Sequence, residues 1–448
     1  MALSARDAAI KALASMRRGQ DFSNRVLDNL LKTDAVNPRD RKLATRLFYG
    51  VVERTITLDA VLAHCSSVAL QKIHPTVLDI LRVGCYQLLF MDAIPDSAAV
   101  NEAVNQTKRY GQARASKFVN GVLRGVQRQG MDFLNSLPDT PDGRAVKHAC
   151  PVELQNLWQQ GYGDEIAARL IAHINDVAPV SLRVNTARTD TAAVLQWLQE
   201  QGISARESDL VANGILLDSG VDGERLAVYN ENWYYHQDIA SQICCAALDA
   251  QCGDRIADVC AAPGGKSFTV AQAVGDSGYI LSCDIHAHKC DDMAKRAETF
   301  GFSAVHTAVR DASKPCPASL KGMFDRVLCD VPCSGLGVIR RKPEIRRKPM
   351  SEIAALPDLQ YRILERSAEM VKDGGVLQYS TCTLNPAENE QVVERFLKEH
   401  PEFSPRILPI PQVFEHLGLA PSWNVTLFPH AADTDGFFVA SMVKGAAE

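Results

Sequence analysis

Short apolar segments alternate with helical stretches from Asp254 to near the end of the chain, and this alternation limits the fold more than any other feature. Five segments rich in Val, Ile and Leu lie at residues 255–259, 279–283, 304–308, 325–329 and 375–379. Strands spaced this far apart need crossover connections, so we expect an α/β domain with a mostly parallel sheet and helices on both faces. In such sheets ligands lie beyond the carboxyl ends of the strands. The residues that follow each strand are therefore the first candidates for a site.

The rest of the chain has other periodicities. From Ala5 to about Arg128, apolar residues recur at three- and four-residue spacing, which predicts an all-α bundle. Between the two parts, residues 180–185 and 214–218 are typical of strands and residues 191–202 of a helix. We predict three domains: a helical domain at 1–140, a small α+β linker module at 141–230 and the α/β domain at 231–448.

Composition limits the class of protein. The 448 residues are 46% hydrophobic and 23% charged, which excludes a disordered chain and suffices for several hydrophobic cores. The longest apolar stretch, residues 77–94, contains Asp79, Arg82 and Asp92, so no segment is expected to cross a bilayer. The first twenty residues lack the apolar core of a signal peptide. We expect a soluble, cytoplasmic protein that does not associate with membranes.

The thirteen cysteines are scattered and include no Cys-x-x-Cys pair. This spacing argues against zinc ribbons and against a disulfide framework, so we expect no metal site. Buried thiols or catalytic thiols remain as explanations.

The charge is unevenly distributed. Residues 1–140 hold 19 basic and 13 acidic residues, whereas the net charge of the whole chain is −5. The basic front end favours nucleic-acid binding, although ordinary scatter on a solvated helical surface explains the difference equally well.

A glycine-containing loop follows the first strand of the α/β domain. Its two adjacent glycines allow a tight turn, and the helix that follows presents N–H groups to an anion. The end of the loop resembles a phosphate-cradling P-loop, but Cys260 stands where that loop needs its first glycine, and Pro263 lacks an N–H donor. A nucleotide-type cofactor is therefore preferred over a nucleoside triphosphate. The loop residues are Cys260, Ala261, Ala262, Pro263, Gly264, Gly265 and Lys266.

Two aspartates end the next strands. Asp284 lies 20 residues beyond Gly264, the separation expected of a carboxylate that binds ribose hydroxyls. Asp311 follows the third strand and is placed to reach the other end of the same ligand. A turn or helix-capping role is the alternative for each of them.

Thiols follow the fourth and fifth strands. Asp330 and Cys333 come after the fourth strand and Cys382 after the fifth, so we expect all three at one edge of the sheet. A thiolate can add to an electron-poor ring carbon, and a nearby carboxylic acid can stabilise the charge that develops on the ring. This combination suits a pyrimidine; in cytosine, for example, addition at carbon 6 makes carbon 5 nucleophilic toward a methyl group. The residues alone do not decide which cysteine attacks.

A run of cations lies between these two strand ends. Residues 340–348 contain six basic side chains in nine positions. A solvated loop is the simpler explanation, but the nearby Asp330 and Cys333 favour contact with a phosphate backbone.

Together, these motifs resemble a known family. The segments 260–266, 330–335 and 380–383 resemble the signature set of the S-adenosylmethionine-dependent RNA cytosine-5 methyltransferases. Residues 183–186, 237–241 and 435–438 are similar to three further family motifs. The helical front end is similar to the RNA-binding domain of the antitermination factor NusB. This combination resembles bacterial methyltransferases of small-subunit ribosomal RNA, with a Rossmann-like class I methyltransferase domain.

The resemblance implies a role for each motif. Cys382 is then the nucleophile, Cys333 helps release the methylated product, Asp330 supports the cytosine ring near N3, and Lys266 helps organise the site. The loop Cys260–Lys266, with Asp284, Asp311 and Asp330, is expected to surround S-adenosylmethionine. The residues expected to contact RNA are Arg183, Asn185, Arg340, Arg341, Lys342, Arg346 and Arg347.

The resemblance also implies the substrate and leaves two rivals. The expected partner of this chain, acting as a monomer, is 16S ribosomal RNA, either naked or in a small-subunit assembly intermediate, with one specific cytosine methylated at carbon 5. DNA or transfer RNA remains open as a substrate. A P-loop NTPase and an RNA-binding protein with an inactive catalytic domain are the two rivals from other classes.

Overall fold

The computed structural model of the chain describes residues 3–19, 26, 29, 36–218, 232–432 and 434–445. The chain divides into two compact units. The first consists of Met1–Asn175 with Arg341–Arg347, and the second of Asp176–Arg340 with Lys348–Glu448. The predicted domain boundary near residue 230 lies outside the described residues.

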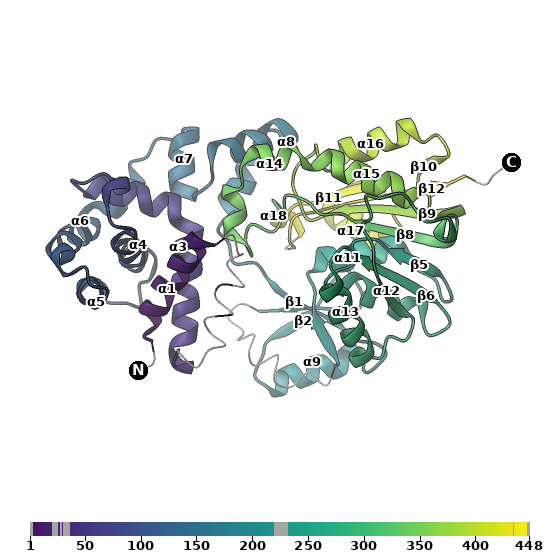
Figure 1. Cartoon of the computed structure of the whole chain (residues 1–448), viewed down its shortest axis with the longest axis horizontal. Coiled ribbons are helices and arrows are strands. Elements are labelled where there is room, and N and C mark those ends of the chain that lie inside the picture. The colour runs from purple at the N-terminus through teal and green to yellow at the C-terminus, as the bar shows by residue number, and fades with distance from the viewer. Residues whose placement is uncertain are drawn as a thin grey trace. The chain divides into compact units, whose positions relative to one another are not determined.

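The first unit is helical, as the three- and four-residue spacing predicts (Figure 1). Ser4 and Thr140 cap two of its helices, each accepting a hydrogen bond from the main-chain N–H three residues later. The kinked helix α8 has non-helical backbone at Gly163, where φ is 82°. The described helices are α1 (Ala5–Arg18), α3 (Pro38–Cys65), α4 (Pro75–Phe90), α5 (Asp96–Arg109), α6 (Ser116–Asn135), α7 (Pro141–His148) and α8 (Val152–His173), with short 3₁₀ turns η1 (Leu70–Lys72), η2 (Ala113–Ala115) and η4 (Pro343–Arg347).

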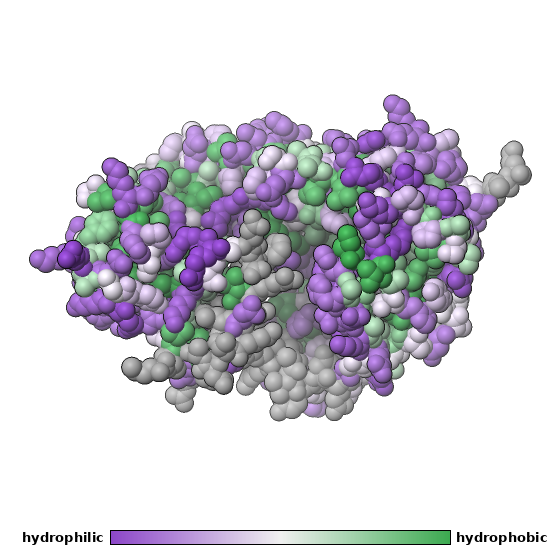
Figure 2. Space-filling model, in the orientation of Figure 1, coloured by the Kyte–Doolittle hydropathy of each residue, from purple (hydrophilic) through white to green (hydrophobic). Residues whose placement is uncertain are grey.

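Leu47, Phe48, Leu58, Ile80 and Leu123 are fully buried in the core of this unit, which draws on α3, α4 and α6. None of the described helices is long and apolar enough to cross a membrane. On the face drawn in Figure 2, hydrophilic residues predominate and apolar residues are interspersed among them.

The second unit begins with a small antiparallel sheet in the order β2-β3-β1-β4. Its strands are β1 (Val180–Val184), β2 (Ala205–Glu207), β3 (Gly214–Leu217) and β4 (Tyr234–His236), and helix α9 (Thr191–Glu200) belongs to the same module. The two strands and the helix that the sequence predicts are present, and β2 and β4 are additional.

The main sheet of the second unit has eight strands. Five of them, β5 to β9, run parallel in the order β9-β8-β5-β6-β7, which confirms the predicted mostly parallel sheet. Three antiparallel strands extend the β9 edge. The bounds are β5 (Arg255–Asp258), β6 (Tyr279–Asp284), β7 (Val305–Val309), β8 (Phe324–Asp330), β9 (Val371–Thr381), β10 (Phe403–Pro405), β11 (Asn424–Leu427) and β12 (Phe437–Lys444).

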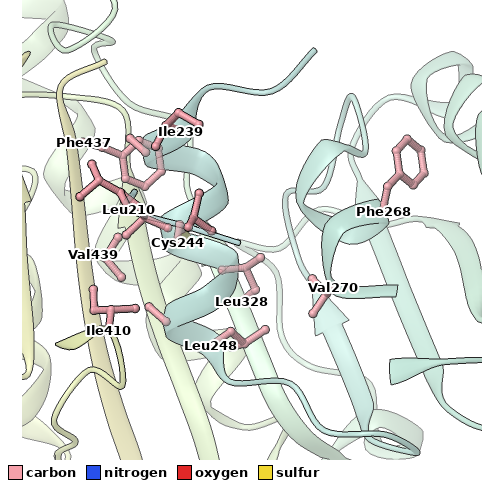
Figure 3. Packing of buried hydrophobic residues seen from close by; sticks show 14 of the residues in the cluster. Leu210, Ile239, Cys244, Leu248, Phe268, Val270, Leu328, Ile410, Phe437 and Val439 are labelled. Carbon is pink, nitrogen blue, oxygen red and sulfur yellow. The ribbon is translucent and has the colours of Figure 1, made fainter. Parts of the chain in front are cut away.

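The helices of this unit connect the strands and supply the apolar layers. They are α11 (Ile239–Leu248), α12 (Gly265–Val274), α13 (Ala287–Phe300), α14 (Met350–Ala354), α15 (Leu356–Ala368), α16 (Glu390–Glu399), α17 (Pro411–Leu417) and α18 (Pro429–Ala432), with the 3₁₀ turn η3 (Ala318–Leu320). Figure 3 shows Ile239, Cys244 and Leu248 of α11 in one apolar cluster with Phe437 and Val439 of β12.

The strand order places a crevice at the centre of the sheet. From β5 the chain proceeds to β6 and β7 on one side, and later to β8 and β9 on the other. At such a reversal the loops beyond the carboxyl ends of adjacent strands separate and leave a ligand site. The carboxyl ends of β5 and β8 meet there, because Asp258 pairs with Leu328.

Candidate active site

The motifs that the sequence analysis singled out follow the carboxyl ends of the parallel strands. The glycine loop follows β5, Asp284 ends β6, Asp311 follows β7, Asp330 ends β8 and Cys382 follows β9. Because the strands are parallel, all these ends lie on one edge of the sheet.

Two thiols meet at this edge. The Sγ atoms of Cys333 and Cys382 lie 3.3 Å apart, within hydrogen-bond distance, and neither cysteine forms a disulfide. Either sulfur can act as the donor. The hydrogen bond with Cys382 raises the pKa of Cys333 well above that of an ordinary thiol, and burial acts in the same direction. Cys333 is therefore held as a neutral thiol beside the other sulfur.

An ion pair lies beside the thiols. Lys266 Nζ is 2.7 Å from Oδ2 of Asp330, and Ser380 Oγ donates to Oδ1 of the same carboxylate at 2.9 Å. Burial alone would lower the pKa of Lys266, but the carboxylate of Asp330 outweighs it and raises that pKa. The lysine ammonium also lies 5.1 Å from the ring centre of Phe437. Asp330 is thus fixed at both oxygens.

The glycine loop makes a tight turn between β5 and α12. Within this loop the Ala262–Pro263 peptide bond is cis. Gly264 has φ of 101°, and a Cβ at this position would lie 2.5 Å from the ring of Phe268. The turn therefore requires glycine for both conformation and space.

Asp258, the last residue of β5, is a buried carboxyl that the sequence analysis did not single out. Ser267 Oγ donates to its Oδ2 at 2.7 Å, and Ser282 Oγ donates to Ser267 Oγ at 2.7 Å. Its Oδ1 is buried and has no hydrogen-bond partner within the described ranges. Burial raises the pKa of Asp258 to about 7. An unsatisfied acceptor of this kind is what a polar ligand group in the crevice would complete.

The aspartates at the end of β6 and after β7 also accept hydrogen bonds in local capping contacts. Asp284 Oδ1 accepts from the main-chain N–H of His286 at 3.0 Å. Asp311 Oδ1 accepts from the N–H and the hydroxyl of Ser313, and the hydroxyl contact lowers the pKa of Asp311. Both contacts use Oδ1, and both carboxylates stay at the edge where a ribose-binding group is expected.

The cationic run is not a fully solvated loop, because part of it forms the 3₁₀ turn η4, in which Pro343, Ile345 and Arg346 are buried. Residues 341–347 belong to the helical unit. There Arg346 is buried and donates to main-chain oxygens of Glu53, Ala149 and Ile174 and to the side chain of Asn175. Burial lowers the pKa of Arg346 to about 10. The prediction that Arg346 contacts RNA is therefore wrong in this structure, since its donors already hold the fold together.

The other predicted cations differ in position. Arg347 is exposed, and Arg341 and Lys342 are half-buried. Arg340, in the second unit, donates to the main-chain oxygen of Thr434. Lys348 Nζ donates to the main-chain oxygen of Ser334 at 3.3 Å.

Two predicted RNA contacts in the α+β module are structural as well. Asn185 is fully buried and donates to the main-chain oxygens of Asn232 and Phe300 at 2.8 and 3.0 Å. Arg183 is 9% exposed and donates to the main-chain oxygen of Ala212 at 2.7 Å. Both side chains spend donor groups on main-chain oxygens inside the second unit. This contradicts the prediction that they contact RNA directly.

No group of three or more His, Cys, Asp or Glu side chains within the described ranges is arranged to hold a metal ion.

Three family models match successive parts of the chain. Residues 3–128 match the NusB family, residues 139–224 match the ferredoxin-like domain of the RsmF/B-like methyltransferases, and residues 245–443 match 16S rRNA methyltransferase RsmB/F. A probable ribosomal RNA small subunit methyltransferase B of Bacillus subtilis is 35% identical over 446 residues, covering 98% of this chain and 99% of the relative.

The chain belongs to the RsmB/F family of 16S rRNA methyltransferases.

Another relative and two solved structures are similar over two thirds or more of this chain. The ribosomal RNA small subunit methyltransferase B of Pseudomonas putida is 32% identical over 448 residues, with 98% of each chain covered. The solved structure of PH0851 has a TM-score of 0.82 at 25% identity and covers 99% of this chain and 100% of its own. NSun6 from Pyrococcus horikoshii, solved with the S-adenosylmethionine analogue SFG, shares the fold with a TM-score of 0.57 at 20% identity, over 67% of this chain and all of its own.

These findings confirm the predicted family and enzyme class and the fold of an S-adenosylmethionine-dependent methyltransferase. They also remove the P-loop NTPase as an explanation of the glycine loop.

Proposed function

We propose that this enzyme methylates carbon 5 of a specific cytosine in 16S ribosomal RNA, with S-adenosylmethionine as methyl donor and through a covalent adduct to Cys382. The observation that carries the proposal is the pair of thiols 3.3 Å apart beside the Lys266–Asp330 ion pair. A simple methyl transfer to a nitrogen or oxygen would need no such pair. Covalent activation of a pyrimidine ring gives each sulfur a task.

Addition begins with Cys382. Its thiol first loses a proton to solvent, and the resulting thiolate attacks carbon 6 of the cytosine. The π electron pair between carbons 5 and 6 shifts onto carbon 5, which becomes nucleophilic. Asp330, held as a carboxylate by Lys266 and Ser380, would accept a hydrogen bond from N3 once this nitrogen takes up a proton from solvent, and N3 gives that proton back when the adduct breaks down. The target base must be unpaired or extruded from a helix to reach these groups.

The glycine loop and the strand-end carboxylates fit the cofactor. The main chain of Cys260–Gly265 would hold it with Asp284, Asp311 and Asp330, and the buried Oδ1 of Asp258 offers an acceptor that the described residues leave unused. When bound, S-adenosylmethionine supplies an electrophilic methyl group.

Product release uses the second thiol. After transfer, the proton on carbon 5 leaves to a base such as water, and its electron pair restores the double bond between carbons 5 and 6. The bond between carbon 6 and sulfur breaks, and its electron pair returns to Cys382. The Cys333 thiol, whose raised pKa keeps it protonated, supplies a hydrogen bond to the departing thiolate.

Among the predicted RNA contacts, the cations that are not buried remain candidates, each on its own unit. Arg340, Arg341, Lys342 and Arg347 follow the site in sequence, and phosphate contacts would position the RNA without reading its sequence. The substrate is either naked 16S ribosomal RNA or an assembly intermediate, bound by a monomer of this chain.

Transfer of labelled methyl from S-adenosylmethionine to purified RNA fractions tests the proposal. Label in 5-methylcytosine at one position of 16S ribosomal RNA is the expected result. Label in transfer RNA, in DNA or on another base would contradict it. Calorimetry with S-adenosylmethionine, with ATP as a control, checks the cofactor separately.

A further inference from the structure

Glu388 is a buried carboxylate that has no ion-pair partner among the described residues and contacts Ser334, the residue after Cys333. Glu388, in the turn between β9 and α16, is fully buried. Its Oε1 accepts from Ser334 Oγ at 2.5 Å and from Asn385 Nδ2 at 2.9 Å. Its Oε2 accepts from the main-chain N–H of Ser334 at 2.8 Å and from Gln360 Nε2 at 2.9 Å. Removing a carboxylate from water is costly, so four donors at one buried site indicate a specific role.

These contacts fix the residues on both sides of Cys333. Glu388 holds the main chain and the hydroxyl of Ser334, directly after the cysteine. Gln360, which donates to Glu388, also donates to the main-chain oxygen of Pro332 at 3.0 Å, directly before the cysteine. The loop that carries Cys333 is therefore tied at both flanks to one carboxylate.

The neighbouring residue does the same for Cys382. Asn389 Oδ1 accepts from Thr381 Oγ1 at 2.6 Å, and Asn389 Nδ2 donates to the main-chain oxygen of Thr383 at 3.0 Å. The hydroxyls of Thr383 and Ser334 lie 2.6 Å apart and join the two halves of the network. Two consecutive side chains thus bracket both cysteines.

We propose that Glu388 and Asn389 are positioning residues, which hold Cys333 against Cys382 so that the thiol can assist release of the methylated base. This inference rests on the proposed function. In this proposal Glu388 contacts neither RNA nor cofactor, because its side chain is fully buried. It acts through its hydrogen bonds with Ser334 and Gln360.

Charge supports the same role. The negative charge of Glu388 adds to the effects of the Cys382 hydrogen bond and of burial in raising the pKa of Cys333. Glu388 therefore helps keep Cys333 a thiol as well as holding it in place.

Glu388→Gln is the direct test, because an amide of the same size cannot accept all four hydrogen bonds. Glu390→Gln is the matched control: Glu390 begins α16, accepts from Thr426 Oγ1 at 3.0 Å and has no part in the network. We expect Glu388→Gln to bind S-adenosylmethionine normally and to lower turnover by about 10- to 100-fold, the effect of displacing a reacting group by about 1 Å. Covalent protein–RNA complex should accumulate, as expected for Cys333→Ala, whereas Glu390→Gln should behave as wild type.

Accumulation of the complex is the deciding result, because a merely structural defect would lower adduct formation and turnover together. If Glu388→Gln lowers both in proportion, or changes neither, the inference is overturned. Should this variant fail to fold, Ser334→Ala removes one donor and keeps the carboxylate, and the same accumulation is expected from it. A wild-type enzyme that forms no 5-methylcytosine would overturn the proposed function instead, so the two failures are distinguishable.

Discussion

The ammonium of Lys266 lies 2.7 Å from Oδ2 of Asp330, joining the start of helix α12 to the end of strand β8. The pair connects the loop assigned to the cofactor with the strand end assigned to the base. The carboxylate of Asp330 is therefore held in place before any ligand binds, and its oxygens are already oriented to accept a hydrogen bond from a protonated N3 of the base.

Asp330→Asn should lower the rate of methyl transfer by about 100-fold or more, because it removes the charge while keeping the shape of the side chain. Initial rates at saturating RNA and S-adenosylmethionine measure the effect. Asp325→Asn is the matched control, since Asp325 is near the opposite end of β8 and is paired with Lys372. Equal rates for the two variants would refute the role given to Asp330.

Sequence reasoning predicted the part of the site that depends on local pattern. Alternating apolar segments with crossover helices determine a parallel sheet, and a parallel sheet brings Asp284, Asp330 and Cys382 to one edge. The antiparallel strands β10 to β12 were not predicted, because they are short or lie at the chain's end and pair across long sequence separations.

The wrong predictions share one physical cause. Arg346 lies in a run of cations, yet it is buried by residues near positions 53, 149 and 174, which no local pattern connects to it. Glu388 was missed for the same reason, since a glutamate before a helix is typical of an exposed first turn. Whether a charged side chain is buried depends on residues far away in the sequence. It therefore cannot be predicted from the residues next to it.

The variants Arg346→Met and Arg347→Ala should differ in their effects: the first should lower stability, and the second should weaken RNA binding. Arg346→Met leaves several buried acceptors without a donor and should destabilise the helical unit by about 2–4 kcal/mol, with the salt dependence of RNA binding unchanged. Arg347→Ala should keep the Tm and lower the slope of log K against log salt by about 0.7–0.9. Titrations at several salt concentrations and thermal melts check both, and a reduced slope for Arg346→Met would show that Arg346 contacts RNA after all.

Gly264→Ala should impair cofactor binding, because the residue has φ of 101° and an added Cβ would lie 2.5 Å from Phe268. We expect a loss of about 2–4 kcal/mol in stability and about tenfold or more in affinity for S-adenosylmethionine. Gly374→Ala provides the control, since Gly374 has φ of 75° and open space around it. Calorimetry on the two variants distinguishes the clash at the loop from the general effect of positive φ, and equal affinities would show that the turn is not needed.

Asp258→Asn should change the pH dependence of stability. Burial raises the pKa of Asp258 to about 7 from an ordinary value of 3.8, so the folded chain takes up a proton more readily than the unfolded chain. The stability that this proton contributes is present below pH 4 and is lost as the pH rises to about 7. The asparagine variant, a mimic of the protonated form, should match wild type at pH 4 and exceed its Tm by about 5 °C at pH 8. A Tm difference that does not vary with pH would exclude the raised pKa.

The role of Cys382 as nucleophile is decided by whether a covalent complex forms between protein and RNA. Wild-type, Cys382→Ala and Cys333→Ala enzymes are incubated with 16S ribosomal RNA and labelled S-adenosylmethionine, then separated on a denaturing gel. We expect free methylated RNA for wild type, neither product nor complex for Cys382→Ala, and a labelled complex that accumulates for Cys333→Ala. Two results would contradict the assignment of Cys382 as the nucleophile: full methyl transfer by Cys382→Ala, or a covalent complex formed by this variant.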